Sequence, residues 1–569
     1  MQFYEERFVA LIHAASGIAT DTLRELLKTP DPKQGDISLP CFAFAKTQKK
    51  NPAQIAQDIA AGLPEDDAFE SIAATGPYLN ARVSTRHIIG ELVPAIIAQG
   101  EAFCDGTAGE GKTVVIDYSS PNIAKPLGFH HLRSTMIGNA LYRVHKALGY
   151  TVVGINFLGD WGKTFGLLAE AFSRFGNREA LEKGGISYLL ELYVKANAEA
   201  KADPAFDEAA RAMFRRQEEQ DPEAVALWQL FREISLREFE RVYNRLDVSF
   251  DLIEGESHYR DGMDAVIEEI ARKTGVREDQ GALVVDMAYD ADEPPMMLKK
   301  SDGATLYATR DVAAAIDRYQ RFAFHKCLYV VGVEQKRHFD QLKRALKAMG
   351  NDFADDMAHV YFGRIQGMST RRGTVVYLDE VLDEARDRAL EKMKDTAAKR
   401  DLDLDTVSEQ VGIGGIVFGD LKNLRTSDYE FNWEEILNPK GFTGICVQYA
   451  HARCCSVLRK GGGAPSPEAV DLTSLTAPEE VALVKELSRM PQWVVQTADT
   501  LEPSRLARGL YEVAKAWNRY QQAGGNDADL RILVDDPALR NARLVLVNAV
   551  RIGLKKGLSL LGISAPEAM

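Results

Sequence analysis

The sequence predicts a multidomain α/β protein whose central part is a parallel sheet. The chain has 569 residues, and single domains rarely exceed about 200, so three to four domains are expected. Short runs rich in Val, Ile, Tyr and Phe alternate with helical segments, which is typical of βαβ units. These runs span residues 113–117, 151–157, 327–333 and 359–365. Sheets of this kind bind ligands at the carboxyl ends of their strands.

The residue pattern changes twice along the chain, which predicts three domains. Residues 1–105 mix helical and strand patterns and lead into a Gly-rich linker, so an α+β domain is expected. Residues 106–435 carry the alternating strands and helices, with a charged helical insertion around 167–300. Residues 436–569 carry amphipathic helices with apolar residues three and four apart, which indicates an all-α bundle.

The composition narrows the class of protein. Hydrophobic residues make up 46% and charged residues 27%, as in globular proteins. The net charge of −14 argues against coating nucleic acid through bulk charge, although local patches could still bind RNA. The six cysteines form neither Cys-x-x-Cys nor a zinc-ligand spacing. We therefore expect a reducing cytoplasmic setting and no tightly bound protein metal.

Two further patterns bear on location. No apolar run reaches the roughly 18 residues that a membrane span needs. The first residues, MQFYEERFVALIHAASG, lack the basic-then-apolar order of a secretory signal. We therefore expect a cytoplasmic protein with no membrane partner.

One stretch, DYSSPNIAKPLGFHHLRST at residues 117–135, joins a predicted strand to a helical segment. Such a turn presents backbone N–H groups and a helix N-terminus to an anion. Lys125, His130 and His131 add cationic or hydrogen-bonding groups. The hypothesis is a phosphate site, and the alternative is a turn whose histidines are packed or exposed.

A second loop, GMSTRRG at residues 367–373, follows the predicted strand 359–365. It combines glycine, hydroxyl groups and arginines, so it could close over a triphosphate and offset charge on a leaving pyrophosphate. The alternative is a basic surface loop.

The two segments resemble the HIGH-type and KMSKS-type signatures of class I aminoacyl-tRNA synthetases. More narrowly, an ordered set of segments over nearly the whole chain is similar to arginyl-tRNA synthetases: SSPNIAK…HLRST, NFLGDWGKTFG, LYATRDV, GMSTRRGTVVYLDEVLDEA, NLRTSDYEF and VQYAHAR. The resemblance implies a Rossmann-like class I catalytic core. It also implies that the α+β N-terminal domain binds tRNA and that the all-α C-terminal bundle binds the anticodon.

The resemblance also implies a reaction. L-Arginine would react with ATP, taken as its Mg²⁺ complex, to give arginyl-adenylate and pyrophosphate. The arginyl group would then pass to the 3′-terminal adenosine of tRNA(Arg) with release of AMP. Family members need bound tRNA for the first step and mostly act as monomers, so a monomer is expected, with no DNA partner.

A guanidinium carries five donors in one plane, so its pocket should hold carboxylates. The resemblance implies these arginine-binding residues: Asp117, Ser119, Asn122, Tyr307, Asp311 and Gln335. Two alternatives stay open. Asp311 could be an exposed helix acid paired with Arg310 or a nearby base. Asn122 and Gln335 could be ordinary turn and helix-start residues.

The resemblance further implies residues for ATP and for catalysis. The ATP-binding set is Pro121, Asn122, Lys125, Gly128, His131, Gly367, Met368 and Ser369. The catalytic set is Lys125, His130, His131, Met368, Ser369 and Arg371.

Both signatures depart from the family pattern. Aligned on the segment LRST, the first histidine of the signature is Gly128 and its glycine is His130. We hypothesise that His130 makes the phosphate contact that the first histidine would make. In the second signature Gly367 replaces a lysine, and by resemblance Lys125 compensates for that loss.

The expected tRNA contacts are Asn80 in the first domain and Tyr449, His451, Arg453 and Met569 in the last. Aromatic stacking on unpaired bases is how single-stranded loops are read. The alternative for part of the helix at 449–456 is core packing.

Two rival functions remain at this stage. The first is a related nucleotidyl transferase or a synthetase for another amino acid, against which the polar set Asp117, Tyr307 and Asp311 argues. The second is a non-catalytic RNA-binding or regulatory protein descended from a synthetase, which the GFHH sequence makes conceivable.

Overall fold

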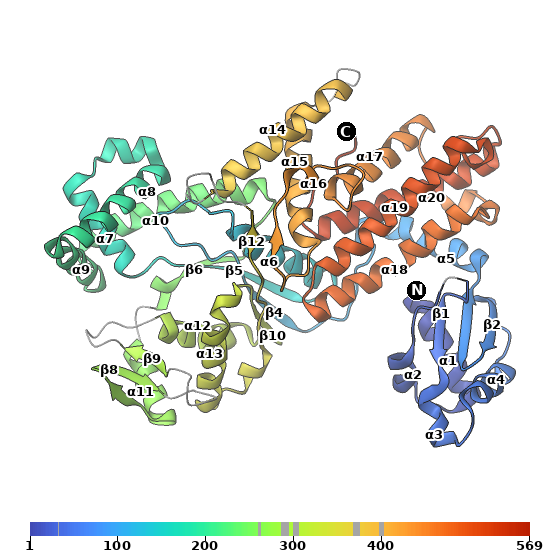
Figure 1. The fold of residues 1–569 in the computed structure, drawn as a ribbon, viewed down its shortest axis with the longest axis horizontal. Helices are drawn as coiled ribbons and strands as arrows, with labels where there is room; N and C mark the ends of the chain where they lie inside the picture. Colours follow the sequence, from blue (N-terminus) through green and yellow to red (C-terminus); the bar gives the residue numbers. More distant parts are fainter. Residues whose placement is uncertain (32, 260–262, 286–294, 300–306, 368–375, 398–402) are drawn as a thin grey trace.

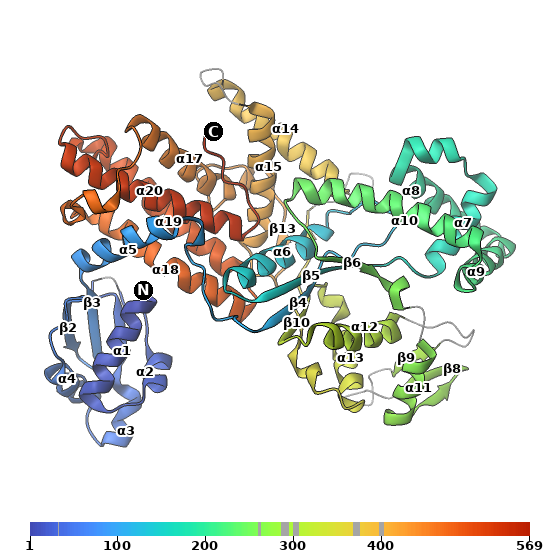
Figure 2. The ribbon, with the colours of Figure 1, turned by 180° about the vertical axis from the view of Figure 1, so that it is seen from behind.

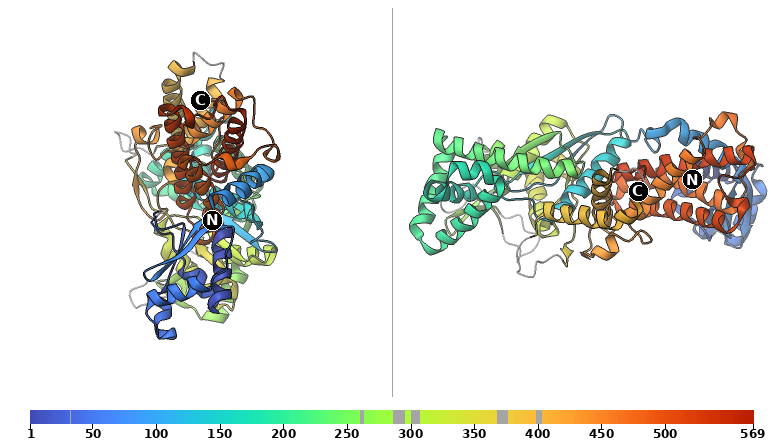
Figure 3. Two further views of the ribbon diagram at one scale, coloured as in Figure 1. Left: turned by 90° about the vertical axis from the view of Figure 1, so that its right-hand side faces the viewer. Right: turned by 90° about the horizontal axis from the view of Figure 1, so that it is seen from above.

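The computed structural model describes residues 1–569 except 32, 260–262, 286–294, 300–306, 368–375 and 398–402. Figure 1 shows a small N-terminal domain, a central sheet with helices around it, and a C-terminal array of helices. The helical insertion and the C-terminal helices lie at opposite ends of the long axis (Figure 3).

The N-terminal domain packs helices on a three-stranded antiparallel sheet. The strands are β1 (Ile37–Pro40), β2 (Phe69–Thr75) and β3 (Tyr78–Val83), in the order β1-β3-β2. The helices are α1 (Gln2–Ser16), α2 (Thr20–Leu26), η1 (Cys41–Phe44), α3 (Ala45–Gln48) and α4 (Pro52–Gly62). Gly17 ends α1 with a φ of 70°, a conformation that glycine adopts without strain. Helix α5 (Thr85–Gln99) and η2 (Gly100–Ala102) lead out of this domain along the C-terminal helices.

The central sheet has five parallel strands, which confirms the predicted fold class. They are β4 (Thr113–Asp117), β5 (Thr151–Leu158), β6 (Leu252–Gly255), β10 (Lys326–Tyr329) and β11 (Met357–His359). Their order is β11-β10-β4-β5-β6, and every pairing is parallel. The chain therefore extends the sheet from β4 to one side and later returns to add β10 on the other. The carboxyl ends of β4 and β10 form the switch point at which such sheets bind ligands.

Helices cover both faces of this sheet (Figure 2). On one face α6 (His131–Ala147) packs through Met136 and Leu141 on a core that contains Ile116 and Leu328. The other face packs on α12 (Tyr307–Phe322) and α13 (Lys336–Ala348), and η4 (Val333–Gln335) leads from β10 into α13. The central strands β4 and β10 are buried on both faces, which explains why they read as continuous apolar runs.

The sequence between β5 and β6 forms four helices that project from the sheet. They are α7 (Lys163–Phe175), α8 (Arg178–Ala202), α9 (Pro204–Glu218) and α10 (Pro222–Arg245). The rest of the region predicted as helical also contains strands. It comprises η3 (Glu256–Tyr259), α11 (Met263–Thr274) and an antiparallel sheet of β7 (Arg277–Asp279), β8 (Ala282–Val285) and β9 (Met296–Lys299).

The region predicted as strand 359–365 is mostly irregular. After η5 (Asp352–Asp356) and β11 the chain runs to the short β12 (Ile365–Gln366), which pairs in parallel with β13 (Tyr429–Glu430). Two helices lie between them in sequence, α14 (Leu378–Ala397) and α15 (Leu404–Leu421).

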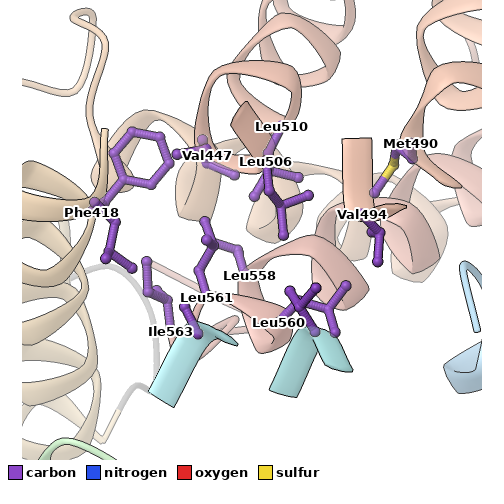
Figure 4. Close-up of a cluster of buried hydrophobic side chains, with 14 of the residues drawn as sticks. Phe418, Val447, Met490, Val494, Leu506, Leu510, Leu558, Leu560, Leu561 and Ile563 are labelled. Atoms are coloured by element: carbon purple, nitrogen blue, oxygen red, sulfur yellow. The ribbon is translucent and has the colours of Figure 1, made fainter. Parts of the chain in front are cut away.

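The C-terminal region is helical, as predicted. Its elements are α16 (Trp433–Ile436), α17 (Gly444–Lys460), η6 (Pro467–Ala469), η7 (Leu472–Ser474), α18 (Pro478–Thr500), α19 (Ser504–Asn526), η8 (Ala528–Leu530) and α20 (Pro537–Leu560). Figure 4 shows their shared core, in which Leu506, Leu510 and Leu558 face one another from α19 and α20. Phe418 of α15 joins this core and ties the bundle to the catalytic part.

Candidate functional site

A polar cavity lies at the switch point of the central sheet. Asp117 and Tyr329 end the neighbouring strands β4 and β10 and are directly paired in register. Both line a cavity of about 740 Å³. Four predicted arginine-binding residues line it together: Asp117, Asn122, Asp311 and Gln335.

The Asp117 carboxylate is already paired inside the protein. Arg318 of α12 approaches it to 2.8 Å, and both side chains are almost fully buried. The Arg318 guanidinium lies between the rings of Phe157 and Tyr329, 5.1 and 5.3 Å from their centroids. Burial raises the pKa of Asp117, and the Arg318 charge and the Ser120 hydroxyl oppose that rise. Asp117 thus forms the floor of the cavity, with an internal arginine as its partner.

Asp311 is the most available carboxylate of the predicted set. Its Oδ2 lies 2.6 Å from His338 Nε2, and its side chain stays 25% exposed. Arg310, the alternative partner, instead donates to Glu256 at 2.7 Å. Asp311 therefore faces the cavity with the His338 imidazole beside it. Tyr307 begins the same helix, and its side chain lies outside the described residues.

Sequence reasoning missed Glu256, Glu334 and Ser120, which also line the cavity. Burial raises the pKa of Glu256 to about 7; Arg310 lowers it, and the nearby Asp311 charge raises it further. Glu256 lies in η3, after the helical insertion, and belongs to no segment used in the resemblance. Only tertiary structure brings it to the site.

Ser119 does not line this cavity, contrary to its predicted role. Its Oγ lies 2.8 Å from the Tyr243 hydroxyl and accepts a hydrogen bond from Thr135. The side chain is buried in this internal network, because φ of 72° at Ser119 turns the chain. The following residue, Ser120, reaches the cavity instead and donates to Asp117 at 2.8 Å.

The loop from Pro121 to Lys125 is held by backbone contacts. The Gly159 N–H donates to the Pro121 carbonyl, and the Ile123 N–H donates to the Gly159 carbonyl. Gly159 is required here, since a Cβ would lie 2.0 Å from Asn122 Oδ1. Pro121 is therefore a buried backbone support, whereas Asn122 is exposed on the cavity wall.

Lys125 points toward the helical insertion. Its Nζ lies 4.2 Å from the ring centroid of Tyr193 on α8. It is half-buried and is not among the residues that line the cavity.

The two histidines lie at the start of α6 with their ring centroids 4.1 Å apart. His131 Nδ1 lies 3.1 Å from the Gly128 amide nitrogen and 3.2 Å from the Gly128 carbonyl oxygen, so it accepts from the first in one tautomer and donates to the second in the other. Burial lowers the pKa of His131 to about 4, with a further effect of His130. His131 is therefore neutral at neutral pH.

The His130 ring occupies the space above Gly128. A Cβ on Gly128 would lie 2.5 Å from His130 Cε1 and 2.7 Å from its Nδ1. The imidazole thus stands where a side chain at position 128 would start. Burial lowers the pKa of His130, and the Glu334 charge opposes that fall.

The second signature loop lies mostly outside the described residues. Met368, Ser369 and Arg371 belong to that part. Gly367, with a φ of 83°, follows β12 at its entrance. Arg133 of α6 supports this entrance by donating to the carbonyls of Gly363 and Ser427 at 2.9 and 3.0 Å.

The C-terminal bundle carries a second polar cavity, of about 470 Å³. Tyr449, Arg453 and Met569, three predicted tRNA-binding residues, line it together with Arg459 and Arg531. A neighbouring cavity of about 420 Å³ shares Tyr449 and Arg453 and adds cationic residues, Lys440, Lys515 and Arg519. This face is basic although the whole chain is acidic.

Two predicted tRNA contacts are buried. His451 is 1% exposed, and its Nδ1 bonds to the Pro566 carbonyl. Asn80 lies in β3, the central strand of its sheet, and is 5% exposed. Neither side chain has the exposure that a direct tRNA contact requires, so His451 instead anchors the segment after α20.

Three family models match the chain in order: an arginyl-tRNA synthetase N-terminal domain over residues 3–83, a class I (R) tRNA synthetase catalytic domain over 92–433, and a DALR anticodon-binding domain over 447–569. The catalytic model alone spans more than half of the chain. The chain belongs to the arginyl-tRNA synthetase family. The resemblance stated from the signature segments is thus confirmed.

Relatives within the arginyl-tRNA synthetase family match nearly full length. An arginine–tRNA ligase of Streptococcus agalactiae is 44% identical over 554 residues, which is 96% of either chain. That of Lactococcus lactis is 43% identical over 567 residues, 98% of either chain. The arginyl-tRNA synthetase structure from Thermus thermophilus superposes with a TM-score of 0.80 at 25% identity, covering 99% of this chain and all of the other.

The described residues contain no group of three His, Cys, Asp or Glu side chains that could hold a metal ion. Within the same described part, no helix is long and apolar enough to cross a membrane.

Proposed function

We propose that the protein is an arginine–tRNA ligase that works in two steps. The arginine carboxylate attacks the α-phosphorus of ATP, forming arginyl-adenylate and releasing pyrophosphate. A ribose hydroxyl of the 3′-terminal adenosine of tRNA(Arg) then attacks the arginyl carbonyl, and AMP leaves. The main support is the carboxylate-rich cavity at the β4/β10 switch point, in a chain of the arginyl-tRNA synthetase family.

Asp311 is the proposed principal ligand of the substrate guanidinium. It is partly exposed to the cavity, whereas the carboxylates of Asp117 and Glu256 each have an internal arginine partner. Glu256 joins it when ionised, because a planar guanidinium can bond two carboxylates at once. Tyr307 completes the pocket on the strength of the family resemblance.

Asn122 and Gln335 are the proposed ligands of the α-amino and carboxylate groups of arginine. Both are exposed and line the same cavity as Asp311. A neutral amide can accept from an ammonium and donate to a carboxylate, so it suits a zwitterion.

ATP, entering as its Mg²⁺ complex, is proposed to bind at the start of α6. His131 presents a neutral imidazole, and the N-terminus of α6 adds a positive electrostatic potential. His130, folded over Gly128, is proposed to take the phosphate contact of the absent first histidine. Lys125 and the loop with Gly367, Met368, Ser369 and Arg371 are proposed to stabilise the charge that develops on pyrophosphate.

The anticodon of tRNA(Arg) is proposed to bind the basic face around Tyr449, Arg453 and Met569. Tyr449 is 39% exposed and Arg453 lies over its ring at 5.7 Å, so an unpaired base could stack there. The proposed enzyme is a cytoplasmic monomer with domains at 1–105, 106–435 and 436–569.

The test is aminoacylation of total tRNA by the purified protein with each amino acid in turn. Charging that depends on arginine and ATP supports the proposal. Charging with another amino acid would show that the enzyme is specific for that amino acid and not for arginine. Absence of any charged tRNA, with every tRNA supply, would favour a non-catalytic descendant of a synthetase.

A further inference from the structure

We propose that Tyr193, on the helical insertion, is a positioning residue that holds the Lys125 ammonium group for amino-acid activation. This inference rests on the proposed function. It adds a role for the insertion, which otherwise lies away from the cavity.

The first observation is the direct contact. The Lys125 Nζ lies 4.2 Å from the Tyr193 ring centroid, within the roughly 6 Å of an effective cation–π interaction. Both side chains are half-buried, which strengthens the attraction because water screens it less. Burial raises the pKa of the Tyr193 hydroxyl, but the nearby Lys125 and Asn197 side chains outweigh that effect and lower the pKa.

The second observation concerns the backbone next to Lys125. The Ala124 N–H donates to Ser235 Oγ of α10 at 2.8 Å, and this bond is buried. Ala124 has a φ of 63°, an unfavourable conformation for a residue with a Cβ. The insertion therefore holds both the backbone before Lys125 and its side chain, through α10 and α8.

These contacts matter because a lysine side chain has four rotatable bonds. A free lysine would spend little time in one orientation, and fixing it carries an entropic cost. A ring that already holds the ammonium reduces that cost before ATP binds. The opposite arrangement, in which Tyr193 keeps Lys125 away from ATP, predicts faster activation when the ring is removed.

The experiment measures arginine-dependent ATP–pyrophosphate exchange with saturating tRNA. Tyr193→Leu should lower kcat about 5- to 30-fold and leave the KM for arginine unchanged. Tyr193→Phe, which keeps the ring, should retain most of the activity. Tyr188→Leu removes another tyrosine ring from the same helix, one that does not hold Lys125, so the kcat of this variant should match the wild type. Thermal melting of each variant checks that it is folded.

The decisive comparison uses Lys125→Ala as a background. If Tyr193 acts through Lys125, Tyr193→Leu should cause no further loss in that background. An equal loss in both backgrounds, an unchanged kcat in the single variant or a faster one would overturn the inference. A wild-type protein that fails to charge arginine would instead overturn the proposed function, and this inference with it.

Discussion

At the residue scale, the first signature has glycine at position 128 and histidine at position 130, the reverse of the family pattern. The His130 imidazole nevertheless lies beside position 128. His130 folds back over Gly128, so its ring begins where a side chain of residue 128 would project. A glycine at 128 and a histidine at 130 therefore depend on each other. We therefore expect His130 to supply the imidazole that the first histidine of the signature would supply.

This dependence predicts the behaviour of a swap. His130→Ala should lower ATP–pyrophosphate exchange about 100-fold, the usual effect of losing one transition-state donor. Gly128→His alone should also be impaired, because its Cβ meets the His130 ring at 2.5 Å. The double variant Gly128→His/His130→Gly should recover most of the exchange rate. Full activity in His130→Ala together with none in His131→Ala would rule out the role of His130.

Glu256 predicts a pH dependence of arginine binding. Its pKa is raised to about 7, so the carboxylate gains its charge as the pH rises through 7. The KM for arginine should fall as the pH goes from 6 to 8, and Glu256→Gln should remove this dependence.

The raised pKa of Glu256 also makes its ionisation unfavourable in the folded state. The contribution of Glu256 to stability is therefore present below about pH 4.5 and is lost as the pH rises to 7. A KM with the same pH dependence in Glu256→Gln would assign the titration to a group other than Glu256.

At the element scale, glycines allow a close helix contact between the catalytic part and the bundle. Gly444 begins α17 against Gly414 of α15. A Cβ on Gly444 would lie 2.5 Å from the Gly414 carbonyl oxygen and 2.7 Å from Phe418 Cβ. Because the neighbour is backbone of a buried helix, it cannot move aside without shifting the whole helix.

We therefore expect Gly444→Ala to lower the free energy of unfolding by about 1–3 kcal/mol, as overpacking does. Gly525 is the matched control, because it lies in α19 with nothing within 4 Å of a Cβ. Gly525→Ala should stabilise the protein by about 0.5–1 kcal/mol through helix propensity. Denaturant unfolding followed by circular dichroism measures both, and equal effects would contradict the packing argument.

At the scale of the whole molecule, ion pairs shielded from water join distant elements, both within the catalytic domain and between domains. Arg133 of α6 pairs with Asp420 of α15 at 2.9 Å, both fully buried. Lys485 of α18 pairs with Asp36 of the N-terminal domain at 2.7 Å, with side chains 19% and 9% exposed. The N-terminal domain thus docks on the bundle through a charge pair that water barely reaches.

Removing that pair should loosen the N-terminal domain. Asp36→Asn should raise the KM for tRNA about 5-fold or more, since a charge-assisted bond contributes about 1.5–3 kcal/mol, while kcat at saturating tRNA stays unchanged. Lys183→Met breaks a pair in which both side chains are 76% exposed, so it should have no effect. Hydrogen exchange of α18 should increase in the first variant alone. Unchanged exchange and KM would show that the domain is held by other contacts.

The sequence by itself determined the alternation of strands and helices and the fold class, and its family motifs supplied four residues of the cavity wall. Asp117, Asn122, Asp311 and Gln335 were all predicted and all line one cavity. The family resemblance supplied these four residues, because a motif is a short stretch of sequence that can be matched without knowledge of the fold. The resemblance likewise assigned Tyr449 and Arg453 to tRNA binding, and both line one cavity of the bundle.

Tertiary structure alone decided which of these groups are free and which are already paired. Nothing local in the sequence indicates that Arg318 neutralises Asp117, that Glu256 enters the cavity after the long insertion, or that Lys125 meets Tyr193. It likewise buried Asn80 and His451, which the motifs had assigned to tRNA. The physical reason is that burial and the choice of partner depend on contacts between residues far apart in the chain, whereas periodicity and motif spacing report only on near neighbours.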